Sequence, residues 1–344
     1  MKKWYDVPGK EGSNVIYSRV RLVRNWRDYP FPGKMTREQS AEMTGRLMEG
    51  LKGLGDEDGT MYRILRLDRM SDLEKTALLE RRAINRSASG KKECAGLILS
   101  EDERTGIVIN GDDHIRIQTL EKGPALPECY RRADAADDYI GERFEYSYDE
   151  KYGYLTSFPT NVGTGLRASV ILHLPMLSRK KNFNSLVADM GRFGTLIRGV
   201  YGEGGENFGS LYQVSNQKTL GQTEREIVDL VTKAAAELDA QERRIRKDAL
   251  EKRPVVCADE AYKSYGVLKY ARRLTRKDAM EFLSQIMAGI TDGIIETREP
   301  CSVYGLMLGV QPANLLQKAE RPLNKEELDA ARADFLRARL PEIR

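Results

Sequence analysis

The chain has 344 residues, 40% hydrophobic and 31% charged, a composition typical of a soluble globular protein and not of a disordered one. Its 56 basic and 52 acidic residues leave a net charge of only +4, without the dense basic stripe of a nucleic-acid binder. Two histidines and four scattered cysteines disfavour both a histidine-rich metal site and a disulfide framework. No secretory signal and no bilayer-length apolar run are found, so we expect a cytoplasmic protein without nucleic-acid or membrane partners.

The first two thirds of the chain mixes strand-like and helix-like segments. Helical patterns are expected around 37–53, 72–86 and 182–198. Short polar turns join three strand-like segments between 94 and 119, which favours antiparallel pairing because parallel strands need a long crossover. Six segments in all are short and rich in β-branched or aliphatic residues, as strands are: 15–22, 61–67, 94–100, 106–110, 115–119 and 168–174.

A long helix is predicted to begin at Thr223, which forms a capping box with Glu226, and to run to about Leu250. Pro254 then interrupts the helical pattern, because proline cannot continue a helix. Beyond it the pattern is helical almost throughout. We therefore predict an α+β fold in two domains, an antiparallel sheet flanked by helices over 1–253 and a smaller all-helical domain over 254–344.

Two segments in the first half carry clustered charges. Arg19 and Arg21 alternate with apolar residues, so on a strand both guanidinium groups share one face. Taken alone, this pattern is more often an exposed face with solvated charge. Further along, Asp112 and Asp113 precede His114 and Arg116, a combination that can place a base near one substrate and a cation near another. A plain hairpin tip fits that second segment equally well.

Two more segments are rich in glycine. In the segment 153–170, Arg167 opens an apolar strand, where an unpaired guanidinium is costly, so an anionic partner is expected. The segment 197–209 contains Arg198 with Glu203 and Glu206 among several glycines, as in a loop that closes over a substrate. Its alternative interpretation is a flexible surface loop.

No common nucleotide-binding motif is present. The sequence lacks a Walker A loop, a dinucleotide-binding fingerprint and the protein-kinase motifs. If a nucleotide binds, arginines must replace the usual lysine and glycine cradle. Arginine suits this role because its planar donors meet phosphate oxygens two at a time and stay charged.

Taken together and in this order, the four segments resemble the ATP:guanido phosphotransferases, the family of creatine and arginine kinases. The resemblance is strongest over 18–22, 160–170 and 197–204, with support from 213–217 and 219–221. Among the members, the bacterial protein-arginine kinases are most similar, since the helical N-terminal domain of phosphagen kinases is missing and a helical tail is present instead.

The resemblance implies ATP and Mg²⁺ as cofactors, with the metal held by phosphate and water. The reaction it implies is in-line attack of an arginine guanidinium nitrogen on the γ-phosphorus of ATP. Asp112 and Glu203 match the carboxylates that grip the guanidinium and accept its proton. The residues it implies around the ATP phosphates are Arg19, Arg21, Arg116, Arg167 and Arg198.

The chain departs from the family pattern on the acceptor side. Gly111 and Asp112 stand where the family has two glutamates, and Phe158 stands where it has a cysteine. Ser157, Phe158 and Glu206 are the further substrate-side candidates. These departures leave room for reduced transfer, and for two alternatives: a catalytically weak, nucleotide-binding regulatory paralogue, and a free-arginine phosphagen kinase.

The resemblance also concerns the helical tail and the partners. Family members carry a phosphoarginine-docking pattern there, of which Asp329 and Arg332 remain in this sequence, while Leu328 replaces the first arginine. A plain amphipathic helix is the favoured interpretation of that stretch. The partners implied are protein substrates with exposed arginines, a second copy of the chain bound through the C-terminal helices, and a zinc-finger-type (McsA-like) activator protein.

Overall fold

The computed structural model describes residues 2–9, 12–201, 207–319 and 321–344. Its centre is an eight-stranded sheet in the order β2-β3-β4-β5-β1-β8-β10-β9, in which every neighbouring pair is antiparallel. A separate hairpin pairs β6 (Tyr148–Asp149) with β7 (Gly153–Tyr154). The sheet strands are β1 (Val15–Arg24), β2 (Tyr62–Arg66), β3 (Gly96–Ser100), β4 (Thr105–Ile109), β5 (Ile115–Lys122), β8 (Leu166–His173), β9 (Thr195–Gly199) and β10 (Leu211–Asn216).

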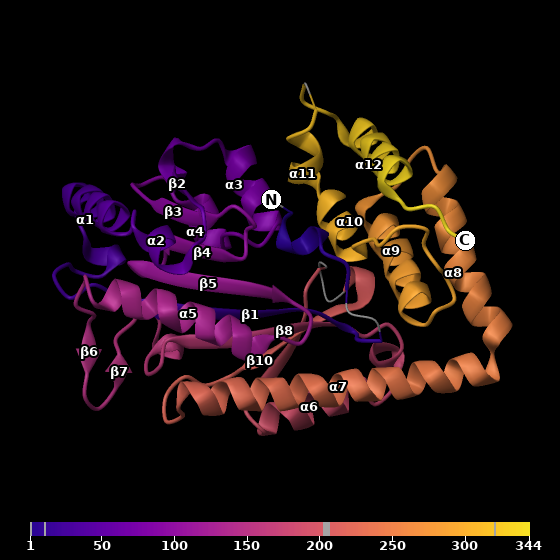
Figure 1. Cartoon of the computed structure of the whole chain (residues 1–344), viewed down its shortest axis with the longest axis horizontal. Helices are drawn as coiled ribbons and strands as arrows, with labels where there is room; N and C mark the ends of the chain where they lie inside the picture. The colour runs from indigo at the N-terminus through magenta and orange to yellow at the C-terminus, as the bar shows by residue number, and fades with distance from the viewer. Residues whose placement is uncertain (1, 10–11, 202–206, 320) are drawn as a thin grey trace.

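Helices cover one face of the sheet along its length. Val20 and Leu22 of β1 point into an apolar core that α5 and α7 complete, and Figure 1 shows these two helices running beside the strands. The helices of this part are α1 (Arg37–Gly50), α2 (Leu54–Asp58), α3 (Asp72–Glu80), α4 (Arg86–Gly90), α5 (Leu126–Gly141), α6 (Phe183–Arg192) and α7 (Glu224–Lys252). Short 3-10 turns lie at Trp4–Asp6, Pro32–Lys34, Leu67–Arg69, Pro159–Asn161, Leu177–Arg179 and Phe208–Ser210.

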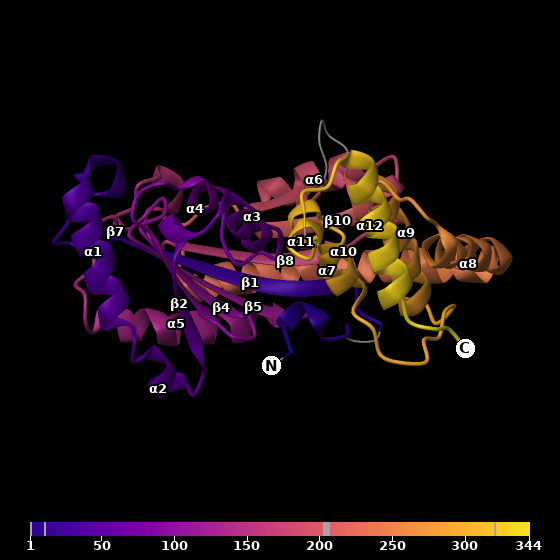
Figure 2. The ribbon, with the colours of Figure 1, turned by 90° about the horizontal axis from the view of Figure 1, so that it is seen from above.

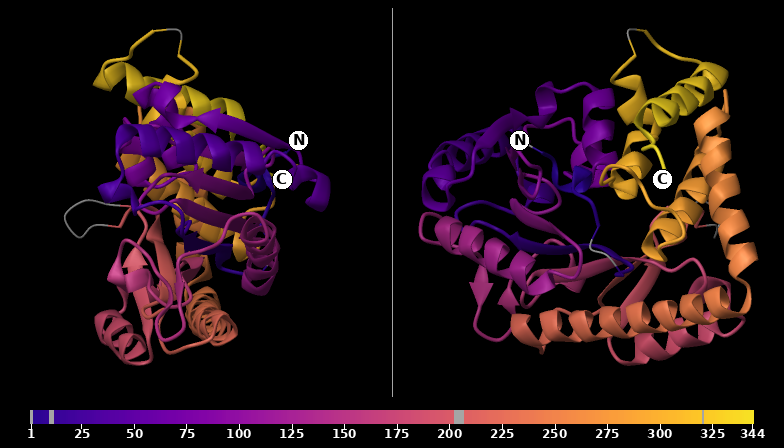
Figure 3. Two further views of the ribbon diagram at one scale, coloured as in Figure 1. Left: turned by 90° about the vertical axis from the view of Figure 1, so that its left-hand side faces the viewer. Right: turned by 45° about the vertical axis from the view of Figure 1, so that its right-hand side comes forward.

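The remaining helices follow a sharp change of direction after α7, which Figure 3 shows in its right-hand view. They are α8 (Pro254–Tyr270), α9 (Arg276–Thr291), α10 (Val303–Gly309), α11 (Pro312–Leu316) and α12 (Lys325–Arg339). The predicted boundary at 253 falls at this change of direction. The division into two domains stays a prediction, because Tyr17 and Leu120 of the sheet share one apolar cluster with Leu283 of α9 and Met307 of α10.

The other face of the sheet is covered in part by these helices and in part by α3 and α4 (Figure 2). Near the start of β1 and the end of β5 it packs on α9, α10 and Trp4, and over β3 and β4 it packs on α3 and α4. The candidate site lies on the same face, where polar and charged side chains line a cavity. Within the described ranges, no helix is both long and apolar enough to cross a membrane.

The predicted fold class and the antiparallel neighbours β3, β4 and β5 are confirmed. The cap predicted at Thr223 is confirmed, and the cap residues Thr275 and Asn324, also readable from the sequence, begin α9 and α12 in the same way. The predicted helix 182–198 was wrong in its second half: α6 ends at Arg192, and β9 follows, because Gly194 has a φ of 86° that no helix continues through. The helix α5 was not predicted.

Candidate functional site

Strand register places the predicted arginines on one face of the sheet. Arg21 of β1 lies directly opposite Arg167 of β8, and Arg19 lies opposite Ser169. On the other side of β1, Arg116 of β5 lies opposite Val23. Since residues two apart share a face, the prediction that Arg19 and Arg21 point the same way is confirmed.

A cavity of about 710 Å³ opens over this face. Four of the five predicted arginines line it, from four different strands, together with the predicted carboxylate Asp112. Polar side chains of the neighbouring strands and of the 160–165 segment complete the wall. The lining residues that the argument uses are Arg21, Arg116, Arg167, Arg198, Asp112 and Gln213.

The hydrogen bonds of these arginines leave much of their donor capacity unused. Arg19 donates from Nη2 to Gln213 Oε1 (2.8 Å) and from Nε to Ser169 Oγ (3.2 Å). Arg167 donates from Nη1 to the carbonyl of Asn216 (2.8 Å). The Nε of Arg21 is buried without a partner among the described residues. Among the residues that the structure describes, no ion pair joins these guanidinium groups to a carboxylate.

The electrostatics of the cluster follow from this arrangement. Burial lowers the pKa of Arg21 well below its usual value, and the neighbouring cations Arg19, Arg116 and Arg167 lower it further. Burial and Arg19 lower the pKa of Arg116 to about 10, even though Asp112 opposes the shift. For Arg167, burial and then Arg198 lower the pKa. A cluster of desolvated like charges of this kind is stabilised by a bound polyanion.

The turn between β4 and β5 carries two carboxylates, Asp112 and Asp113, which have different surroundings. Asp112 is half-buried, lines the cavity and accepts a hydrogen bond from Asn85 Nδ2 (2.8 Å). Asp113 is buried, and its Oδ1 accepts from Asn25 Nδ2 (2.8 Å) and from the Ser157 amide (2.7 Å). Asp113 therefore fixes the 156–158 segment against the turn, and Asp112 is the carboxylate free to meet a substrate.

His114 serves the same local scaffold. Its Nδ1 accepts from the Trp26 amide (3.0 Å), so the neutral ring carries its proton on Nε2, which lies 2.9 Å from the carbonyl of Pro30. Burial lowers the pKa of His114. Both ring nitrogens are occupied by backbone groups, so this histidine is a structural link and no candidate for a catalytic base.

The remaining predicted residues are placed as follows. Phe158 is 51% exposed, and its carbonyl accepts a hydrogen bond from Thr156 Oγ1 (2.8 Å). Glu203 and Glu206 lie outside the described residues. In α12, Arg332 is buried and donates to Asp329 and to the carbonyls of Val310 and Leu274, which is a packing arrangement remote from the arginine face. Their docking role stays a prediction.

Arg82 is a functional candidate that the sequence did not reveal. It follows the end of α3 with a φ of 71°, and its Nε and Nη2 are buried with no hydrogen-bond partner in the described part of the chain. Its guanidinium carbon lies 4.6 Å from the centre of the Tyr201 ring, and its charge lowers the pKa of Arg19. No local pattern marks this arginine, because a distant helix brings it to the sheet.

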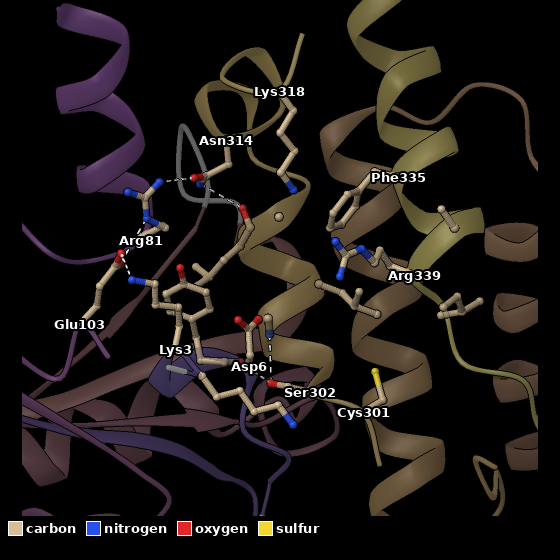
Figure 4. Close-up of a pocket in the computed structure, with 18 of the residues that line it drawn as sticks. Lys3, Asp6, Arg81, Glu103, Cys301, Ser302, Asn314, Lys318, Phe335 and Arg339 are labelled. Atoms are coloured by element: carbon tan, nitrogen blue, oxygen red, sulfur yellow. Dashed lines mark hydrogen bonds and ion pairs between the residues drawn. The ribbon is translucent and has the colours of Figure 1, made fainter. Parts of the chain in front are cut away.

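A larger cavity of about 920 Å³ separates α3 and the N-terminal segment from the C-terminal helices (Figure 4). On one wall, the buried carboxylate of Glu103 pairs with Lys3 (3.4 Å) and with Arg81 (3.3 Å), and Arg81 also donates to Asn314 Oδ1 of α11 (2.9 Å). Phe335 and Arg339 of α12 form the opposite wall. These paired charges join the sheet to the helices, unlike the unpaired arginines of the first cavity.

Two family models match the chain. Residues 42–245 match the ATP:guanido phosphotransferase C-terminal catalytic domain, and residues 254–344 match the protein-arginine kinase McsB C-terminal domain. The chain is 37% identical over 340 residues to the protein-arginine kinase of Bacillus velezensis, covering 99% of this chain and 93% of that protein. It is 33% identical over 340 residues to that of Halothermothrix orenii, covering 99% and 97%.

Solved structures of guanidino kinases share the fold. The crystal structure of lombricine kinase superposes with a TM-score of 0.60 at 26% identity, covering 73% of this chain and 72% of that one. The duplicated taurocyamine kinase from Schistosoma mansoni with bound transition-state-analogue components gives a TM-score of 0.61 at 24% identity, covering 77% and 38%. At that identity the second likeness concerns the fold alone.

Proposed function

The chain belongs to the ATP:guanido phosphotransferase family and is a kinase, and from this premise we propose that it phosphorylates arginine side chains of proteins with ATP. The observation that carries the proposal is the face on which Arg21, Arg116 and Arg167 lie together, with no ion pair to a carboxylate among the described residues. Such a face matches the charge of a nucleotide triphosphate.

The arginines bind the phosphates and stabilise the charge that develops during transfer. Arg21 and Arg167 sit side by side on adjacent strands, so their planar donors can meet neighbouring phosphate oxygens. Arg116 and Arg198 line the same cavity from other strands, and Arg19 lies on the same face of β1 as Arg21. Because the strands are hydrogen-bonded into one sheet, these groups are held in place before the substrate arrives.

On the acceptor side, Asp112 holds the incoming guanidinium and accepts its proton. A guanidinium nitrogen attacks the γ-phosphorus, a P–N bond forms, and the bond to the β,γ-bridging oxygen breaks so that ADP leaves. The hydrogen bond from Asn85 fixes the direction of the Asp112 carboxylate. Glu203 is proposed as the second guanidinium-binding carboxylate on family resemblance alone.

Mg²⁺ is proposed to arrive on the ATP phosphates. Among the described residues, no group of three or more histidine, cysteine, aspartate or glutamate side chains is arranged to hold a metal ion. Phosphate oxygens and water are proposed to supply most of its ligands, as is usual for Mg²⁺ bound with a nucleotide. When bound, the ion neutralises phosphate charge.

We further propose a cytoplasmic homodimer that acts on exposed arginines of other proteins, with a zinc-finger-type activator. The support for the dimer is α8, which lies at the rim of the molecule in Figure 1. Its outer side exposes large apolar side chains at helical spacing, which a second copy would cover. They are Val255, Val256, Tyr262, Val267 and Tyr270. Sedimentation at varied concentration, with Val255→Glu and Tyr270→Glu in one variant, tests this interface.

The decisive experiment incubates the purified chain with Mg-ATP and a folded, arginine-rich protein and measures acid-labile phosphoarginine. We expect product from the wild type and a loss of it in Arg167→Ala. Asp112→Glu, which lengthens the carboxylate by one methylene, is expected to raise the rate. Absence of product from the wild type, with unchanged behaviour of Arg167→Ala, would sink the proposal.

Two further measurements separate the alternatives. ATP binding that Arg21→Ala abolishes, with turnover at background, would identify a nucleotide-binding regulatory protein instead. Free arginine offered as acceptor in place of the protein addresses the phosphagen-kinase alternative. A rate with free arginine that exceeds the rate with the protein would favour that alternative.

A further inference from the structure

A third cavity, of about 740 Å³, lies where the sheet meets the C-terminal helices. Its floor is the start of β1 and the last residue of β5, Lys122, which pairs with Tyr17 across the two strands. Its walls come from the end of α9, the segment that follows it and the first turn of α10. In Figure 1 the arrow of β5 points toward these helices. Neither the phosphate-binding arginines nor Asp112 line this cavity.

The walls combine apolar and polar side chains. The apolar part includes Val15, Ile16, Met287, Ile290, Ile295, Val303 and Tyr304, and Ser13, Thr291 and Thr297 add hydroxyl groups. Four charged residues also line it: Lys122, Arg298, Arg344 and Glu296. The single acid, Glu296, lies 3.9 Å from Arg344 and so already has a cation beside it. The lining thus has more positive than negative charge, on an apolar background.

Lys122 is the least exposed of the three lining cations. Its amine lies 5.7 Å from the centre of the Tyr304 ring, and no hydrogen bond or ion pair of this amine is found within the described ranges. Burial lowers the pKa of Lys122 to about 8, with Cys301 as an opposing, weaker influence. An ammonium group held on an apolar wall without a counter-charge is costly, and an anion in the cavity would remove that cost.

We propose that this cavity is a ligand site separate from the kinase centre, which binds a monoanion with an apolar body, such as a carboxylate on an aliphatic chain. The carboxylate pairs with Lys122, and the chain lies against the aliphatic walls. A single amine suits one negative charge, whereas a phosphate dianion is better matched by several donors, such as those of the arginine face. Because both the sheet and the helices form the walls, the ligand stabilises their contact.

Calorimetric titration of the full chain with octanoate tests the proposal. We expect saturable binding to the wild type at pH 7. The affinity of Lys122→Met for octanoate should be lower than that of the wild type by roughly tenfold or more, because methionine keeps the approximate length of the side chain and removes its charge. Lys233→Met, at an exposed position of α7, is the matched control and should bind as the wild type does. Octan-1-ol and acetate, which each lack one half of the proposed ligand, should bind far more weakly.

A pH series on the wild type gives the same information without a variant. Around Lys122, burial raises the pKa of Cys301 to about 11 and also raises the pKa of Tyr304. The other charged groups of the lining are Arg298, Arg344 and Glu296. Between pH 7 and 9.5 the Lys122 amine loses most of its charge, and octanoate stays ionised. Affinity should fall roughly seven- to thirtyfold: the ammonium fraction falls about thirtyfold for a pKa of about 8, and a neutral amine that binds tenfold more weakly limits the loss to the lower figure.

Three outcomes would overturn the proposal. They are no saturable octanoate binding, equal binding by Lys122→Met and the wild type, and an affinity that does not change between pH 7 and 9.5. Melting curves establish that Lys122→Met is folded. If it is not, the pH series on the wild type decides.

Discussion

Strand β1 buries two arginines three residues apart that face opposite sides of the sheet. Arg24 points into the helix-covered core, where its Nη2 lies 2.5 Å from Asp137 and 3.6 Å from Glu224. The Arg24 guanidinium also stacks on the Tyr154 ring at 3.6 Å. Arg21 points to the open face, where its nearest charged neighbours are other arginines and its Nε has no partner among the described residues.

The two environments shift the pKa in opposite directions. At Arg24 burial is the largest single influence and lowers the pKa, but Asp137, Tyr154, Tyr146 and Glu224 together outweigh it, and the pKa rises. At Arg21, burial and the neighbouring cations act together, and the pKa falls. A fold can therefore bury a guanidinium with its own acid, or leave it for an anion brought by a ligand. Whether a buried arginine has a structural or a functional role therefore depends on its charged partner and not on its being an arginine.

The largest expected effect is on catalysis, at Arg21. Arg21→Met should lower the rate of phosphoarginine formation roughly a thousandfold, because a preorganised donor to the transferred phosphate is lost. Melting temperature should not fall, since the substitution relieves repulsion with Arg19, Arg116 and Arg167. Rate assays and melting curves on the same preparation check both parts. A stable variant with near wild-type activity would contradict the functional role that the comparison gives to Arg21.

The second effect is on stability, at Arg24. Arg24→Met should destabilise the fold by about 3–5 kcal/mol, because Asp137 is left buried with an uncompensated charge. The matched control is Arg27→Met, which removes an exposed pair with Glu145 and should cost under about 1 kcal/mol. Urea denaturation measures both. Equal losses in the two variants would show that burial does not distinguish these pairs.

A third effect extends the comparison to the acceptor side. Asp112→Asn should lower the transfer rate roughly a hundredfold by removing the proton acceptor, while nucleotide affinity stays unchanged. Asn can still accept the hydrogen bond from Asn85, so the turn is expected to keep its shape. Single-turnover rates and nucleotide titrations separate the two quantities. A variant that lost ATP affinity to the same degree would place Asp112 in nucleotide binding instead.

The smallest expected effect is on the pH dependence of stability, at His173, a buried histidine that stays neutral in the folded chain. Burial lowers the pKa of His173 well below its ordinary value of 6.5, and its Nε2 lies 2.7 Å from Ser284 Oγ. As pH falls below 6.5, His173 becomes protonated in the unfolded chain but stays neutral in the folded chain. Stability is therefore full above that pH and falls below it, by up to about 1.4 kcal/mol per pH unit.

Urea denaturation from pH 7 to 5.5 measures this slope. His173→Gln should show a shallower slope than the wild type, because it removes the titrating ring and keeps a polar partner for Ser284. Part of the slope will remain, since burial lowers the pKa of His114 as well. Equal slopes in the two proteins would mean that His173 is accessible to protons in the folded state.

Much of the fold was readable from local sequence. Alternation determined that Arg19 and Arg21 share a face, and the cap residues Thr223 and Asn324 determined where two helices begin. These features depend on residues within a few positions of one another, which is the range over which periodicity and capping act. The helix predicted across Gly194 failed for a local reason too, since the glycine adopts a positive φ there.

Only the tertiary structure decided which charged residues meet. Arg82 reaches the arginine face from the end of α3, and Asp113 turns inward to Asn25 while its neighbour Asp112 turns to the cavity. Distant helices bring Tyr304 to within 5.7 Å of the Lys122 amine at the end of β5, and the residues that the structure describes there give this amine no ion pair. Such partnerships join residues tens or hundreds of positions apart, so packing, and not local pattern, determines whether a buried charge serves the fold or awaits a ligand.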